Sequence, residues 1–136
     1  MTDAFPITNY HNPECGTSRN ALAMIEAAGY APQVVAYRET GWTRPLLDQL
    51  LTEMNATPRD LLREKGTPAA ELGLLDPSLS GEAILDAMLA HPILVNRPIV
   101  VTPRGTKLCR PSEAVLGLLD RKPNSFTKED GEAVRL

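Results

Sequence analysis

The residue best suited to chemistry in this sequence is Cys15, which lies where a short apolar run gives way to an amphipathic pattern. A thiol at the start of a helix meets unpaired backbone N–H groups and the positive end of the helix dipole. Both favour the thiolate over the thiol, and both also favour a bound oxyanion. The sequence therefore predicts a nucleophile and an anion site at one turn. The alternative is a buried Cys that acts as a small hydrophobic residue.

Three arginines could add positive charge to such a site. Arg63, Arg97 and Arg110 each flank an apolar segment, and the last two each precede a proline. Guanidinium groups suit tetrahedral oxyanions because their hydrogen bonds are charge-assisted and bidentate, and they also stabilise a nearby thiolate. Because Arg97 and Arg110 begin and end a predicted hairpin region, we expect both at one end of a sheet. Each could alternatively be a solvated surface residue.

Two further residues could assist the thiol. His11 lies four residues before Cys15, where it could act as a base or an electrostatic helper, or could be a loop residue that bonds the backbone. Pro98 lies just before a predicted strand, where a cis bond would bring a backbone edge to face the thiol. Since cis bonds are about 5–6% of X–Pro bonds, an ordinary strand-edge proline is the alternative.

The cysteine count argues against a local dithiol and against a metal centre. The chain has two cysteines, Cys15 and Cys109, and no Cys-x-x-Cys pair exists because position 18 is Ser. Two Cys and two His without ligand spacing predict no zinc site. We expect no disulfide in a reducing compartment. Cys109 is expected to be a strand residue without chemistry, with a resolving thiol as the alternative.

Length and composition fit one soluble domain with a modest core, since the chain has 136 residues and 43% of them are hydrophobic. No apolar run approaches the roughly 18 residues that a membrane span needs. Residues 1–4 lack the features of a signal peptide, so a cytoplasmic protein without membrane contact is expected. The net charge of -3 argues against general nucleic-acid binding.

The elements that must position these residues begin with a β-α-β pattern. Residues 6–10 and 33–37 are short apolar runs typical of strands. Between them, Leu22, Ile25 and Ala28 recur at helical spacing. This order favours a parallel pair of strands joined by a crossover helix. Thiol chemistry is thus expected at the turn between the first strand and the first helix.

A helical insertion is predicted next, at about residues 40–92. Four cap residues indicate helix starts, namely Thr43, Thr57, Thr67 and Ser80. These helical pieces separate the second predicted strand from the third, so we expect them to form an inserted subdomain.

The pattern then returns to strands and ends in a polar segment. Apolar residues at 99–101, a turn at 103–105 and the run 106–109 predict a hairpin. Pro111 is expected at the first position of a closing helix. The tail, about residues 122–136, is polar, and we expect it to be mobile.

Five segments of the sequence resemble the glutaredoxin-coupled arsenate reductases. They are residues 10–20, 61–63, 91–103, 108–113 and 126–131, which follow the order of that family and span nearly the whole chain. The resemblance implies a single thioredoxin-like α/β domain over the whole chain. Its sheet would be mixed and four-stranded, with a helical insertion between strands two and three. It also implies a cytoplasmic role in arsenic detoxification.

The resemblance implies a role for each candidate residue. Cys15 would attack arsenate, with His11 near the thiol and Pro98 packed beside it as a structural residue. The positions that lower the thiol pKa and bind the arsenic oxyanion would be Arg63, Arg97 and Arg110. Glutathione would be the co-substrate that attacks the Cys15–arsenic adduct, and a glutaredoxin would reduce the resulting mixed disulfide. No bound cofactor, metal, nucleic acid or membrane is implied.

Two other functions stay open on the sequence. A related glutathione-dependent thiol reductase would share the Cys15 turn and the Arg-Pro start of a strand, but the joint presence of Arg63 and Arg110 favours arsenate. A thiol-stress regulator that binds RNA polymerase would share the fold, but such proteins carry Cys-x-x-Cys and this chain has Ser18. Thiol-dependent arsenate reduction by the purified chain would distinguish these functions.

Overall fold

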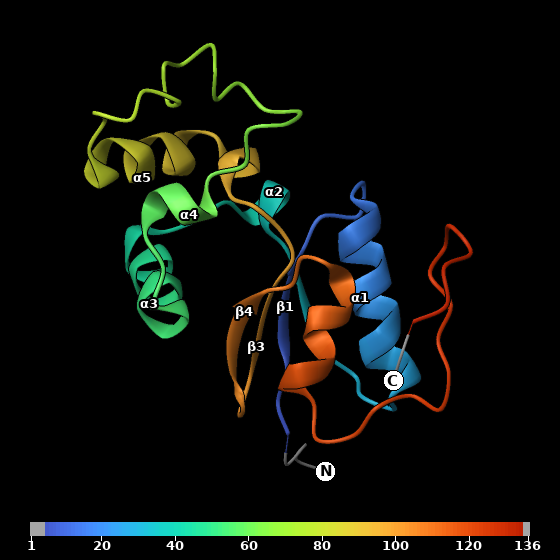
Figure 1. Ribbon diagram of the computed structural model, residues 1–136. Helices are drawn as coiled ribbons and strands as arrows, with labels where there is room; N and C mark the ends of the chain where they lie inside the picture. The colour runs from blue at the N-terminus through green and yellow to red at the C-terminus, as the bar shows by residue number, and fades with distance from the viewer. Residues whose placement is uncertain (1–4, 135–136) are drawn as a thin grey trace. The chain divides into compact units, whose positions relative to one another are not determined.

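The structure is a computed structural model that describes residues 5–134 (Figure 1). The chain divides into two units, of which the first combines Met1–Ala36 with Arg97–Leu136 and the second is Tyr37–Asn96. The second unit corresponds closely to the segment expected as a helical insertion, about residues 40–92.

Two expectations from the sequence concern, wholly or in part, residues outside the range that the structure describes. The expected lack of a leader concerns residues 1–4, and the expected tail ends with residues 135–136; both stretches lie outside the described residues. Between residues 5 and 134, no helix is long and apolar enough to cross a membrane.

The first unit contains a four-stranded sheet in the order β2-β1-β3-β4. Its strands are β1 (Thr8–His11), β2 (Gln33–Ala36), β3 (Ile99–Thr102) and β4 (Gly105–Leu108). β1 pairs in parallel with β2 and antiparallel with β3, while β3 and β4 form an antiparallel hairpin. The predicted mixed four-stranded sheet is therefore confirmed. β1 has a neighbouring strand on each side, β2 and β3. The turn that follows β1 therefore lies at the end of the sheet, between these two strands.

Two helices pack together in this unit. α1 (Gly16–Ala27) follows β1 and the 3-10 helix η2 (Ser112–Leu118) follows β4; Figure 1 shows them side by side, in blue and orange. Met24, Ile25 and Val115 are fully buried in their shared core together with side chains from the sheet. Burying one such side chain stabilises the fold by about 1.5–3 kcal/mol. This core holds the first turn of α1 in place.

Two element boundaries differ from expectation. Pro111 was expected at the first position of a closing α-helix, but it is the extended residue before η2, which is a 3-10 helix. Tyr37 was expected to end the second strand, but it begins α2. Its side chain is buried in the second unit, where its hydroxyl donates to the Val95 carbonyl oxygen at 3.3 Å. Burial of this ring therefore overrides its strand propensity.

The second unit is helical. Its elements are α2 (Tyr37–Thr40), α3 (Arg44–Met54), α4 (Pro58–Leu61), α5 (Gly81–Ala90) and the 3-10 helix η1 (Pro92–Leu94). All of them lie between β2 and β3 in the sequence. The predicted helical insertion between the second and third strands is therefore confirmed.

Three of the four predicted helix starts are confirmed by their caps. Thr43, Thr57 and Ser80 each accept a hydrogen bond from a backbone N–H of the first turn that follows. At Thr57 the cap is reciprocal, since the Asp60 carboxylate accepts from the Thr57 backbone N–H at 2.9 Å. These polar groups satisfy N–H donors that a helix start otherwise leaves unpaired.

The fourth predicted start, at Thr67, is wrong. The Thr67 hydroxyl donates back to the Arg63 carbonyl oxygen at 2.7 Å and accepts from the Ala69 N–H at 3.2 Å, so it stabilises a turn. Gly66 and Gly73, with φ of 74°, interrupt the helical path on either side. The segment between α4 and α5 is consequently a series of turns.

The tail contacts the first unit. Residues 127 and 133 form a β-bridge, and Phe126 and Val134 pack against the core. Lys128 pairs with Glu113 at 2.8 Å. The expectation of a mobile tail does not hold for these residues, because its polar composition did not show the apolar anchors at either end of the bridge. Figure 1 shows this tail in red beside α1.

Candidate functional site

The turn before α1 is built by Asn12. The Asn12 carbonyl oxygen accepts the Cys15 N–H at 3.0 Å, and its side-chain oxygen accepts the Glu14 N–H at 3.0 Å. The Cys15 carbonyl oxygen accepts the Arg19 N–H at 3.0 Å, which begins the helix. Cys15 is thus the last residue before α1, as predicted, and its sulfur faces the N–H groups of the first turn.

The Cys15 thiol is strongly acidified. Its side chain is buried, which raises its pKa, but the Ser18 backbone N–H and the guanidinium groups of Arg97 and Arg110 bond the sulfur and outweigh burial. The net effect lowers the pKa of Cys15 to about 6. At pH 7 the thiolate then exceeds the thiol about ten to one. A buried Cys that acts only as a small hydrophobic residue does not have this environment.

Arg110 joins two parts of the site. Its Nη1 lies 3.8 Å from the Cys15 sulfur and donates to the Arg97 carbonyl oxygen at 2.9 Å. The structure therefore brings Arg97 and Arg110 together beside Cys15, at one end of the hairpin, as expected. Such a pair of guanidinium groups beside a helix start can hold a tetrahedral oxyanion against the thiolate.

The bonds before two prolines have the cis form. The Arg97–Pro98 bond is cis, as expected for a proline beside the thiol, and the Arg110–Pro111 bond is also cis, which was not predicted. The Pro98 carbonyl oxygen accepts the Cys109 N–H at 2.8 Å, which ties the two arginine segments together.

His11 ends β1, immediately before the turn. Burial lowers its pKa, the positive charge of Arg19 lowers it further, and Glu26 opposes both. Its Nδ1 is buried without a hydrogen-bond partner among residues 5–134. The ring is therefore neutral at pH 7, which disfavours a role as a fixed positive charge.

Arg63 belongs to the second unit, directly after α4. Its side chain donates to the Lys65 carbonyl oxygen at 3.1 Å, and its backbone N–H donates to the Leu94 carbonyl oxygen at 2.7 Å. Its predicted role at the oxyanion remains a proposal.

Cys109 has the opposite environment to Cys15. It is fully buried in the core of the first unit, just after β4. Burial raises its pKa to about 12, against a small lowering by Lys107. A thiol in this environment stays protonated and inert, which agrees with the expectation of a residue without chemistry.

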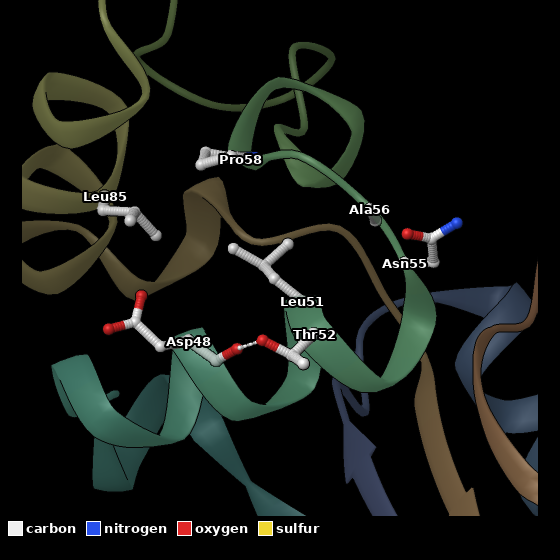
Figure 2. Close-up of a pocket in the computed structure, with 7 residues that line it drawn as sticks. All are labelled: Asp48, Leu51, Thr52, Asn55, Ala56, Pro58 and Leu85. Carbon is white, nitrogen blue, oxygen red and sulfur yellow. Dashed lines mark hydrogen bonds between the residues drawn. The ribbon is translucent and has the colours of Figure 1, made fainter.

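A metal centre and a second anion site each require particular side chains close together among the described residues. In residues 5–134, no three His, Cys, Asp or Glu side chains are placed to share a metal ion. The second unit has a surface groove of about 460 Å³, with Leu51, Pro58 and Leu85 among its lining residues (Figure 2). The lining contains no Cys, His, Lys or Arg, so the groove offers no anion site.

Sequence reasoning missed two contributors to the site. Ser18 was considered only as the position that lacks a second Cys. Its backbone N–H nevertheless donates to the Cys15 sulfur, and its hydroxyl oxygen accepts a hydrogen bond from the Asn12 N–H at 3.4 Å. Asn12 was not singled out, although an Asn-Pro pair is a known signal for a turn.

A mixed sheet with a thiolate at the start of its first helix and a cis-proline directly before its third strand defines a thioredoxin-like thiol protein. The ArsC family model matches residues 10–118. The chain therefore belongs to the ArsC family.

Similar proteins agree with this assignment. The chain is 59% identical to an arsenate reductase of Rhizobium meliloti over 129 residues, which cover 94% of this chain and 92% of the relative. It is 58% identical over the same length to arsenate reductase ArsI2 of Synechocystis sp., with 94% and 92% covered. A solved arsenate reductase structure from Vibrio cholerae aligns with a TM-score of 0.80 at 40% identity, over 86% of this chain and 100% of that one. The predicted thioredoxin-like fold is confirmed.

Proposed function

We propose that this protein reduces arsenate to arsenite, with Cys15 as the nucleophile and glutathione and a glutaredoxin as the source of electrons. The observation that carries the proposal is the contact of the Cys15 thiolate with Arg97 and Arg110 at the start of α1. An arsenate dianion fits this site because it is tetrahedral and anionic. The arsenate reductases among its relatives support the same substrate.

The first step forms a bond between the Cys15 sulfur and arsenic. Arg97 and Arg110 hold the arsenate oxygens, and the thiolate attacks As(V) while one oxygen leaves as water after taking up two protons. Arg63, from the inserted segment, is proposed as a third ligand of the same oxyanion. The chain is proposed to work as a single domain.

The second step needs an external thiol, because one protein thiol cannot supply two electrons. The glutathione sulfur attacks the Cys15 sulfur, and the S–As bond breaks with its electron pair left on arsenic. Arsenic falls from As(V) to As(III), arsenite leaves, and a Cys15–glutathione disulfide remains. A glutaredoxin thiol then takes the glutathione and frees the Cys15 thiolate. Dependence on reduced glutathione fits a cytoplasmic location.

His11 is proposed to act near the thiol as a neutral group, and Pro98 as the structural residue that presents the backbone beside it. Because the pKa of His11 is lowered, its ring can accept a proton at neutral pH but does not carry a fixed charge.

The test is arsenite formation by the purified chain with arsenate, glutathione and glutaredoxin, compared with each omitted. We expect continued arsenite formation only in the complete mixture, about one arsenite per Cys15 without glutaredoxin, and none without arsenate or glutathione. Cys15→Ser should form no arsenite, and Cys109→Ala, the matched control, should keep near wild-type turnover. If the complete mixture forms no arsenite but the protein reduces glutathione mixed disulfides, the related thiol reductase is the correct function.

A further inference from the structure

Arg19 lies in the first turn of α1, where a free guanidinium would be expected to attract an anion. Its donors are instead used within the protein. Nε and Nη2 donate to the two carboxylate oxygens of Glu129 at 3.0 Å and 2.7 Å, and Nη1 donates to the Pro13 carbonyl oxygen at 2.8 Å. Arg19 therefore links the tail to the turn that carries Cys15, and it is not a free ligand for a substrate oxyanion.

Glu129 is held against α1 by a second bond. Its backbone N–H donates to the Asn20 side-chain oxygen at 3.1 Å. The tail around Glu129 forms a hydrogen-bonded loop, since the Lys128 N–H donates to the Glu132 carbonyl oxygen at 2.8 Å. The Lys128 side chain is only 12% exposed, and its ammonium group pairs with Glu113 of η2 at 2.8 Å. The Glu129 carboxylate is therefore presented by an anchored segment and not by a free end.

The first turn of α1 contains no acidic residue, so the Cys15 thiolate is the negative charge that this segment itself places at the helix start. A carboxylate near a helix N-terminus interacts favourably with the helix dipole. Glu129 supplies such a carboxylate from 110 residues away in the sequence. A Cβ on Gly16 would lie 3.1 Å from Glu129 Oε1, so the carboxylate sits directly against the residue that follows Cys15.

We propose that Arg19 and Glu129 form a clamp through which the tail positions the Cys15 turn. This inference rests on the proposed function, and both are positioning residues. Glu129 orients the Arg19 guanidinium, which fixes the Pro13 carbonyl and hence the turn that presents the thiolate to the anion site. An ordinary exposed ion pair would contribute little to stability and nothing to Cys15 reactivity. The two side chains are 45% and 46% exposed, so stability alone does not distinguish these cases.

The test measures Cys15 alkylation in a Cys109→Ala background. The variants are Arg19→Ala, Glu129→Ala and their double variant. The control is Glu132→Ala, because Glu132 is an exposed acid of the same tail segment whose carboxylate pairs with Lys128 at 3.4 Å and not with Arg19, while Lys128 keeps its closer pair with Glu113. Iodoacetamide rates against pH give a limiting thiolate rate, and thermal unfolding verifies that each variant folds. Because Cys15 is only 9% exposed in its braced turn, we expect the limiting rate to rise about threefold or more in both single variants and in the double variant.

The second readout is kcat/KM for arsenate in the complete assay. We expect each single variant to lose about tenfold and the double variant to lose no more than either, because both residues act through one contact. Glu132→Ala should match the background in both readouts. Single variants that behave like Glu132→Ala, or losses that multiply in the double variant, would overturn the clamp. If the background protein forms no arsenite, the proposed function fails, while the alkylation rates still decide the clamp.

Discussion

The Arg110 guanidinium lies 3.8 Å from the Cys15 sulfur, although the two residues are 95 positions apart in the sequence. The pairing of β1 with β3 and of β3 with β4, together with the packing of η2 against α1, brings them together. The same guanidinium donates to the Arg97 carbonyl oxygen. One arginine therefore stabilises the thiolate and fixes the segment that carries the second arginine. Several measurable properties depend on this arrangement.

The Cys15 thiol should titrate with a pKa of about 6. The start of α1 and the two arginines stabilise the thiolate more than burial disfavours it. Thiolate absorbance or alkylation rate against pH in Cys109→Ala measures the value directly. A midpoint near the free-thiol value of about 8.5 would contradict the site geometry.

The same pKa shift predicts a pH-dependent stability. The folded-state pKa of Cys15 is lowered, so its contribution is fully present above the unfolded-state pKa of about 8.5 and is lost as pH falls through about 6. Denaturant unfolding at pH 5.5 and pH 8.5 should therefore show wild type gaining stability over Cys15→Ala at the higher pH. An equal difference at both pH values would show that folding does not shift this pKa.

The planar guanidinium groups of the three arginines should contribute to arsenate binding through their geometry as well as their charge. Each of Arg63→Lys, Arg97→Lys and Arg110→Lys keeps a positive charge but loses the planar donor geometry. Since a lost bond to a charged group costs about 1.5–3 kcal/mol, kcat/KM for arsenate should fall about ten- to a hundredfold. We expect Arg97→Lys to lose the most kcat/KM. In each variant the loss of kcat/KM for arsenate should be larger than the rise in the Cys15 pKa accounts for. Three variants with wild-type kcat/KM would mean that these arginines do not bind the oxyanion.

The features of the fold and site that could be predicted from the sequence are mostly those set by residues close together in the chain. The helix starts at Thr43 and Ser80 and the strand-to-helix position of Cys15 rest on local signals, and they were predicted. The cis bond before Pro98 was expected from its place before the third strand of the fold, with an ordinary strand-edge proline as the alternative. Thr67 carried the same local signal as the other caps, but its hydroxyl bonds back to Arg63 between two glycines with positive φ.

Asn12 and Ser18 were missed although they lie in the Cys15 turn itself, whereas the other missed features of the site are long-range or conformational. The Arg19–Glu129 pair spans 110 positions, and no periodicity relates an acidic tail residue to the start of the first helix. The distance from Arg110 to Cys15 depends on the β3–β4 hairpin and could be anticipated only as a shared end of the sheet. The second cis bond, before Pro111, has no separate signal in the sequence.

Cys109 should be dispensable for catalysis. Its thiol is fully buried and its pKa is raised to about 12, so it can neither attack an adduct nor resolve a disulfide at neutral pH. Cys109→Ala should keep most of the arsenate turnover and all of its glutathione requirement, with a modest loss of thermal stability from the small cavity. Arsenate reduction by wild type without glutathione, abolished in Cys109→Ala, would instead identify a protein dithiol.

His11 should be neutral under assay conditions. Burial and the positive charge of Arg19 lower its pKa from the ordinary value of 6.5. An NMR titration of the imidazole signals, assigned by comparison with His11→Asn, should give a midpoint below 6.5 for His11. A midpoint above 7 would show that His11 is held as a cation beside the thiol.

The most direct test of the proposed mechanism is one turnover without glutaredoxin. Wild-type protein mixed with arsenate and glutathione should release about one arsenite per Cys15 and should carry one glutathione on Cys15 in the mass spectrum of the intact chain and its peptides. Adding glutaredoxin should remove that glutathione and restart arsenite release. Arsenite formation without any glutathione on Cys15, or no arsenite at all, would contradict a Cys15–arsenic adduct that is resolved by glutathione.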